Sequence, residues 1–224
     1  MRAQHEHEFE AAPGLPEPLP AGEQILWQGT PDWRTLAIEA LHVRKLALYF
    51  AAMWGLQAAY LAGQPSGEMG RSLLTSAAMA AIALVLLSAT AWFAARSTLY
   101  TLTNKRVVMR VGIVLTLTFN LPLSQVAAAS LRMGSGGKGD VALRLKGPDR
   151  IAWLHLWPHA RPWALKNPEP SLRCLADASA VGALVQQAWQ AANPGVAASI
   201  GPVQAEASNQ GQFEPARHSV AAST

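Results

Sequence analysis

Residues 99–126, LYTLTNKRVVMRVGIVLTLTFNLPLSQV, decide the fold because they resemble an antiparallel sheet placed just after a long apolar run. Their β-branched and aromatic side chains, with turn signals at residues 104–105 and at Gly112, predict strands at 97–103, 106–111 and 114–121. Three further strands are expected at 126–132, 141–145 and 151–156. The glycine-rich segment 133–140 lacks the spacing of a phosphate-binding loop and predicts a hairpin loop.

The apolar run before this sheet is long enough to cross a membrane. Residues 73–95 contain no charged side chain, and 23 residues at about 1.5 Å each span a hydrocarbon core of about 30 Å. An earlier run, 46–63, is shorter and contains Gln57, so alone it would also fit a buried core helix. Tyr49 and Tyr60 near its ends, and a short connection at 64–72, favour a second span. We therefore expect a two-helix transmembrane hairpin.

Positive charges flanking the two runs predict the orientation of this hairpin. Arg44 and Lys45 precede the first run and Arg96 follows the second, whereas the connection carries only Arg71, offset by Glu68. Because basic residues favour the cytoplasmic side, both termini are expected in the cytoplasm. The predicted organisation is an extended proline-rich segment 1–24, a cytoplasmic pre-membrane segment 25–45, spans 46–63 and 73–95, a periplasmic loop 64–72, a sheet domain 97–192 and a disordered tail 193–224.

The sheet domain is expected to end in a helix that opens at Asp177, a favourable N-cap. Apolar side chains follow it at helical spacing, so one face should close over the sheet. These positions are Val181, Leu184, Val185, Ala188 and Trp189.

A stripe of small residues recurs every fourth position in the first run, which lets another helix backbone approach closely. Two interpretations remain open: the stripe packs the two spans together, or it docks another helix, including that of a second copy in a homodimer. The stripe consists of Ala51, Gly55, Ala59 and Gly63.

Basic and aromatic residues of the sheet domain are the candidates for docking on a membrane surface or a partner. Residues 96–173 carry twelve Lys and Arg against three Asp and Glu, whereas residues 1–45 carry four against seven. Anionic headgroups attract such a basic surplus, although a merely solvated face is the alternative. The candidates are Arg96, Lys105, Arg106, Arg110, Trp153, Trp157, Arg161 and Trp163.

Catalytic and metal-binding signals are weak. Cys174 is the single cysteine, and no nucleophile and base stand at recognisable motif spacing. His155 and His159 could share a helix face, but Pro158 between them opposes a regular helix. We expect neither an enzyme, nor a cofactor, nor a nucleic-acid-binding protein.

Two sets of motifs resemble known families. The motif YTLTNKRVVMRVGI, residues 100–113, with LPLSQV at 121–126, resembles the bacterial pleckstrin-homology-like domain. The segments 8–33 and 157–175 are similar to the PuhB family of photosynthetic complex assembly proteins from purple bacteria. The fold implied is an α+β membrane protein in which a transmembrane hairpin precedes an antiparallel β-barrel or sandwich with a C-terminal capping helix.

The same resemblance implies a non-enzymatic assembly factor. Such a factor would lie in the bacterial inner, intracytoplasmic photosynthetic membrane and would contact reaction-centre and core-antenna subunits during assembly. A lipid-headgroup-binding module of another role is the alternative that the basic domain leaves open.

Overall fold

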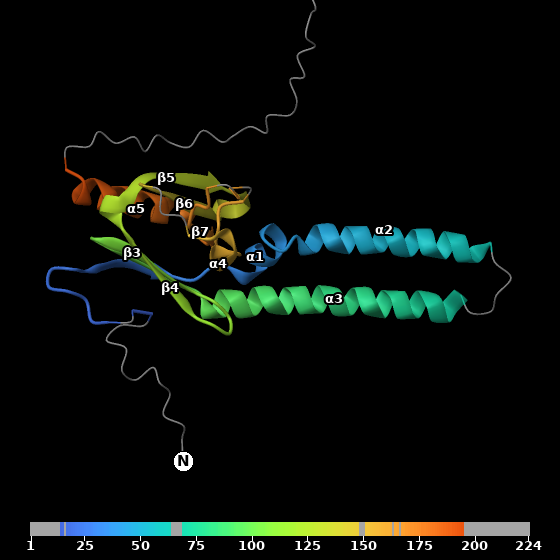
Figure 1. The fold of residues 1–224 in the computed structure, drawn as a ribbon. Coiled ribbons are helices and arrows are strands. Elements are labelled where there is room, and N and C mark those ends of the chain that lie inside the picture. Colours follow the sequence, from blue (N-terminus) through green and yellow to red (C-terminus); the bar gives the residue numbers. More distant parts are fainter. Residues whose placement is uncertain are drawn as a thin grey trace, which may run out of the picture.

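A pair of long antiparallel helices projects from a β-rich body (Figure 1). The computed structural model describes residues 14–15, 17–63, 69–147, 151–162, 164–165 and 167–194. Most of the proline-rich start, residues 64–68 of the connection, Trp163 and the tail after Pro194 lie outside the described residues.

The first sheet has four antiparallel strands in the order β1-β2-β3-β4. The predicted meander is confirmed, with its third strand beginning at Leu117 rather than Val114. The fourth strand, β1, comes from the segment that the sequence places before the membrane, and it pairs Trp27 with Leu102 of β2. The strands are β1 (Ile25–Gly29), β2 (Leu99–Thr103), β3 (Arg106–Val111) and β4 (Leu117–Pro122).

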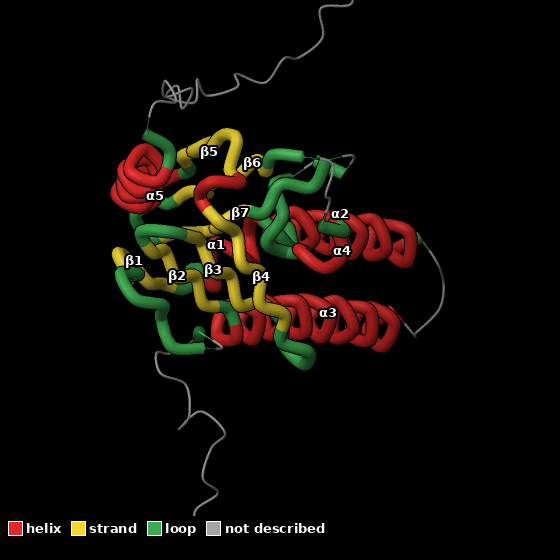
Figure 2. Tube along the Cα trace, turned by 60° about the vertical axis from the view of Figure 1, so that its left-hand side comes forward, coloured by secondary structure: helices red, strands yellow, loops and turns green. Residues whose placement is uncertain are grey.

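The second sheet has three antiparallel strands in the order β5-β6-β7. The short helix α5 (Ala178–Ala192) packs against it, and its N-cap Asp177 accepts a hydrogen bond from Ala180 N at 3.0 Å, as predicted. Figure 2 shows the two sheets and α5 around one interior. The strands are β5 (Val126–Met133), β6 (Gly139–Leu145) and β7 (Ser171–Leu175).

The core between the sheets is shared by both of them and by α5. Tyr100 and Met109 from the first sheet and Leu143 and Leu172 from the second are fully buried in one cluster with Trp189. Trp189 donates its indole N–H to Val126 O at 2.9 Å, which satisfies its only polar group inside the core. Within the described residues the two sheets are separate, so the arrangement is a sandwich rather than the closed barrel also expected.

The predicted strand at 151–156 is wrong. Residues Trp153–Leu156 form a single helical turn, α4, and Leu154 is 76% exposed while Leu156 is fully buried. In a strand these two side chains would share one face, so their different burial requires another conformation. The last strand is instead β7 (Ser171–Leu175). The sequence pattern does not predict it, because the strand is short and follows Pro168 and Pro170.

The helix pair consists of α2 (Val43–Ala62) and α3 (Met69–Ser97), which run antiparallel beside each other (Figure 1). Within the described residues, α3 alone is both long and apolar enough to cross a membrane. The second span expected at 46–63 is a helix, but its composition does not identify it as a span because charged Lys45 and polar Gln57 lower its mean hydropathy. Gln57 Nε2 donates to Ser72 Oγ at 3.0 Å, so this amide is satisfied by the neighbouring helix.

The last turns of α3 belong to the body rather than to the projecting pair. Ala94 and Ala95 are buried against Leu36 of α1 (Trp33–Glu39) and Cys174 of β7, in a second small core. Strand β2 begins at Leu99, two residues after α3 ends. The helix pair is thus joined to the sheets through packed side chains rather than through a free linker.

Candidate functional site

Acidic residues from the N-terminal segment neutralise basic residues of the sheet domain. Glu23 contacts Arg106 at 2.7 Å, Asp32 contacts Lys138 at 2.9 Å, and Glu39 contacts Arg132 at 2.6 Å. Burial alone would raise the pKa of Glu23, but hydrogen bonds from Arg106 and Thr103, with the charge of Arg106, hold it below the usual 4.5. Three carboxylates of the N-terminal segment therefore balance about a third of the basic surplus read from residues 96–173.

The basic candidates for docking are not gathered on one face. Lys105 and Arg106 lie at the β2–β3 turn, where Lys105 Nζ donates to Ala21 O at 3.3 Å. Arg96 lies at the other end of β2, in the last turn of α3, with its guanidinium 5.1 Å from the Trp92 ring centroid. Arg161 is paired with Glu169 at 2.9 Å. Arg110 lies in β3 opposite Leu99 and Thr118.

Two of the three aromatic candidates, Trp153 and Trp157, lie in α4 and just after it. Trp153 is half-buried in α4, and Trp157 is exposed in the turn that follows. Trp163 lies outside the described residues.

The small-residue stripe of α2 does not face α3. Its four members are all exposed, and a Cβ added at Gly55 would meet no other atom within 4 Å. The partly buried positions of α2, including Phe50 and Ala58, lie elsewhere on the helix. The interpretation that the stripe packs the two helices together is therefore wrong, and docking of another helix stays a prediction.

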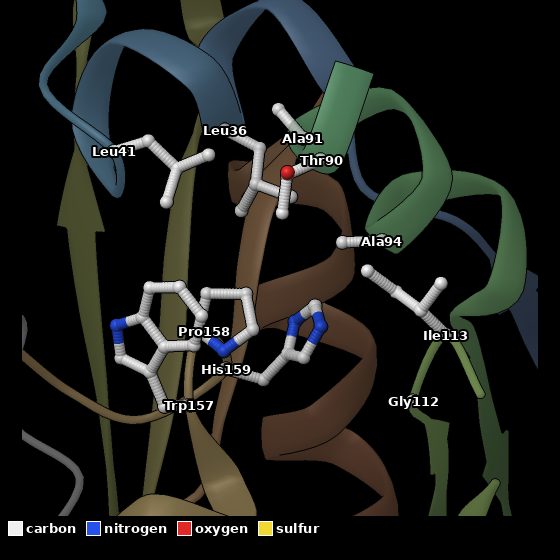
Figure 3. Close-up of a pocket in the computed structure, with 10 residues that line it drawn as sticks. All are labelled: Leu36, Leu41, Thr90, Ala91, Ala94, Gly112, Ile113, Trp157, Pro158 and His159. Atoms are coloured by element: carbon white, nitrogen blue, oxygen red, sulfur yellow. The ribbon is translucent and has the colours of Figure 1, made fainter. Parts of the chain in front are cut away.

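A cavity of about 190 Å³ opens where the helix pair meets the body (Figure 3). Its walls come from four separate segments: α1 and the residues after it, the end of α3, the β3–β4 loop, and the turn after α4. Apolar side chains dominate the lining, which is formed by Leu36, Leu41, Thr90, Ala91, Ala94, Gly112, Ile113, Trp157, Pro158 and His159.

His159 borders this cavity at the start of a chain of hydrogen bonds. Its Nε2 lies 3.0 Å from Thr98 Oγ1, and its Nδ1 lies 2.6 Å from the Tyr100 hydroxyl. Because the Thr98 hydroxyl donates its proton to Ala94 O at 2.7 Å, it must accept from His159, which assigns the imidazole proton to Nε2. Nδ1 then accepts from Tyr100, whose oxygen accepts from Arg173 N at 3.3 Å. The chain ties β7 and β2 to the end of α3.

The environment keeps His159 neutral. Burial, with a smaller effect of the Arg173 charge, lowers its pKa to about 3. Burial likewise raises the pKa of the Tyr100 hydroxyl. Because both imidazole nitrogens already have partners, His159 lacks a free nitrogen for a ligand or a metal. His155 is exposed on α4, so these two histidines do not form a shared site.

Arg173 is a buried cation behind the same turn. Its side chain is 6% exposed, Nη1 donates to Pro158 O at 3.1 Å, and Nε lies 3.7 Å from Asp140 Oδ2. The next residue, Cys174, is buried, and burial raises the pKa of its thiol to about 12. A thiol that stays protonated is a poor nucleophile. Arg173 and Cys174 are therefore structural residues.

The arrangement can bind an apolar group but shows no catalytic geometry within the described residues. Sequence reasoning singled out His159 and Trp157 and missed the cavity, because Leu36, Ala91 and Gly112 come together only in the folded chain. The apolar run 113–115 was a visible signal, but Val114 and Leu115 were assigned to the predicted strand 114–121.

Comparison with known proteins assigns the class. The chain belongs to the bacterial PH domain family, whose model matches residues 47–189 and so includes the helix pair. A relative from Rhodobacter capsulatus is 37% identical over 195 residues, which cover 84% of this chain and 89% of the relative. That relative is described as an uncharacterized 23.7 kDa protein in the puhA 5' region. No solved structure matches significantly.

Proposed function

We propose that the protein is a membrane-anchored assembly factor of the PuhB type, which helps to assemble the photosynthetic reaction centre and its core light-harvesting complex. It acts by protein contacts at the cytoplasmic membrane face rather than by catalysis. The motifs at 8–33 and 157–175 and the relative from the puhA 5' region support the photosynthetic assignment.

The apolar surface of the helix pair is the observation that carries the membrane role. Large apolar side chains are exposed around both helices, including Leu48 and Leu56 of α2 and Leu74 and Val85 of α3. A helix that is apolar all round and unburied in its own chain fits a bilayer better than water. We propose that α2 also crosses the membrane, since it lies beside α3 and its 20 residues reach about 30 Å.

The ends of the helices favour a cytoplasmic body. Arg44 and Lys45 open α2 and Arg96 ends α3, so these charges lie at the end of the pair that joins the body. Arg71 lies at the opposite end. The basic end is expected in the cytoplasm, which places both termini there.

The alternative of a headgroup-binding module is less favoured. Two of the basic candidates for docking, Arg106 and Arg161, are already paired with carboxylates of the same chain, and the basic candidates do not share one face.

Deletion of the gene in a phototrophic host tests the proposal. Membrane absorption spectra should lose reaction-centre and core-antenna bands, and the full chain should restore them. A chain in which residues 43–89 are replaced by a short soluble linker keeps the buried end of α3 and should not restore them. Unchanged spectra after deletion would overturn the assembly role, and restoration by the linker variant would overturn the need for the anchor.

A further inference from the structure

The loop between β3 and β4 exposes an unusual amount of apolar surface. Ile113, Val114 and Leu115 are 47%, 89% and 81% exposed. No charged side chain occurs between Arg110 and Arg132, so the loop and all of β4 are uncharged. Three consecutive exposed aliphatic residues are unfavourable in water and mark a contact surface.

The topology places this loop beside the base of the helix pair. Strand β2 leaves the end of α3, β3 returns antiparallel to it, and the next loop therefore comes back to α3. Ile113 lines the same cavity as Thr90 and Ala94 of α3 (Figure 3). Trp157, which is also exposed, lines the cavity from the turn after α4.

The loop is built into a fixed shape. Gly112 has φ +119°, and a Cβ at this position would overlap the carbonyl oxygen of Leu115. Only glycine permits this close return of the chain, and pairing resumes immediately with Val111 opposite Leu117. The three aliphatic side chains are thus presented on a short, closed tip.

The length of α3 indicates where a bilayer would end. From Leu73, where the uncharged run begins after Arg71, to Trp92 the helix is about 30 Å long, roughly the thickness of a hydrocarbon core. Thr90 and the adjacent Ala91 therefore lie close to the boundary between hydrocarbon and headgroups, and Ile113 lines the same cavity as these two residues.

We propose that the tip Ile113–Val114–Leu115 enters the bilayer that holds α2 and α3, at the boundary between acyl chains and headgroups. This rests on the proposed membrane anchoring. The loop is then a further membrane contact that fixes the tilt of the body. The β2–β3 turn with Lys105 and Arg106 lies at the far end of the same strand pair and points away from the membrane. A bilayer fits this tip because its apolar surface continues that of the helices.

Position-specific labelling of the full chain in vesicles tests the tip directly. Val114→Cys, Lys105→Cys and Val85→Cys each receive an environment-sensitive fluorophore in detergent, and the labelled chains are then reconstituted into phosphatidylcholine–phosphatidylglycerol vesicles. Cys174 is buried and its thiol is protonated, so the unsubstituted chain serves as the labelling control. Leu115→Cys is a second reporter of the tip. Quenching by chain-brominated lipid is compared with quenching by aqueous iodide.

The expected quenching distinguishes labels in the tip from labels in helix α3 and in the β2–β3 turn. Labels at Val114 and Val85 should be quenched several-fold more by brominated lipid than the label at Lys105, which iodide should quench. Iodide quenching at both Val114 and Leu115, with lipid quenching at Val85, would overturn the inference and leave the anchor standing. Shielding of the tip from both quenchers would also overturn it, in favour of a protein contact. A Val85 label that lipid does not reach would overturn the anchor itself.

Discussion

His159 is a buried polar residue that holds the end of helix α3 against strand β2. Its two nitrogens are used by Thr98, which caps a carbonyl near the end of α3, and by Tyr100 of β2. A protonated imidazole would need an acceptor for a second proton, but the atom beside Nδ1 is already a donor. The neutral ring is therefore part of the fold.

His159 should make the protein less stable in mild acid. Its folded pKa is about 3 against about 6.5 in the unfolded chain, so below pH 6.5 only the unfolded state gains this proton. The free energy of unfolding should fall by about 1.4 kcal/mol between pH 7.5 and 5.5. The lowered pKa values of Glu23, Asp32 and Glu169 keep these carboxylates ionised over that range.

Thermal or denaturant unfolding of the detergent-solubilised chain at the two pH values measures this effect. His159→Gln should be less stable at pH 7.5 and should lose most of the pH dependence. His155→Gln, which changes an exposed histidine nearby, should keep it. An equal pH dependence in His159→Gln would show that another group is responsible.

At the level of elements, residue patterns predicted those strands whose side chains alternate locally. Strands β2, β3, β5 and β6 and helix α5 follow from β-branched alternation, turn residues and a capping aspartate. Strand β1 was missed because its partner β2 lies more than 70 residues away, beyond any local pattern. Helix α1 was missed because its seven residues bury only Leu36 and Ala37.

The candidate site was harder to predict than the fold for the same reason. The aromatic residues around 153–163 stood out in the sequence, but the cavity also needs Leu36, Ala91 and Ile113 from three other segments. Basic residues such as Arg106 looked free because their partner Glu23 lies 83 positions away. Charge counts along a chain cannot show such pairing.

The outward face of α2 gives a prediction at this scale. Gly55→Leu should leave the α2–α3 pair and the body intact, because a Cβ at Gly55 meets open space. Ala58→Leu, on a partly buried position of the same helix, should loosen the pair through steric overlap. Proximity crosslinking between cysteines placed in α2 and α3 measures both effects. Loss of the pair in Gly55→Leu would contradict the observed orientation of α2.

The whole molecule is a single unit in which the segment before the hairpin completes the domain after it. Residues 97–192 were predicted as the domain, but the segment 23–39 supplies a strand, part of the core and the carboxylates that pair with Arg106, Arg132 and Lys138. The body therefore begins before the helix pair and ends after it.

A fragment comparison tests this organisation. Residues 97–194 alone should not fold cooperatively, because β2 would have a bare edge and the end of α3 would be missing. Residues 17–42 joined by a short linker to 90–194 should fold, and circular dichroism melting should show a cooperative transition. A cooperative transition in the shorter fragment would contradict the requirement for the N-terminal segment.

The pairing of β1 with β2 also orders events during biosynthesis. The ribosome releases β1 first, but its partner is made only after both long helices have emerged. The two strands can meet only when the chain has doubled back through the helix pair. A newly made chain whose two long helices do not fold back on each other keeps its first strand unpaired and cannot complete the sandwich. Under the proposed membrane anchoring, insertion of the helix pair thus becomes a checkpoint for maturation, because it brings the first strand to its partner.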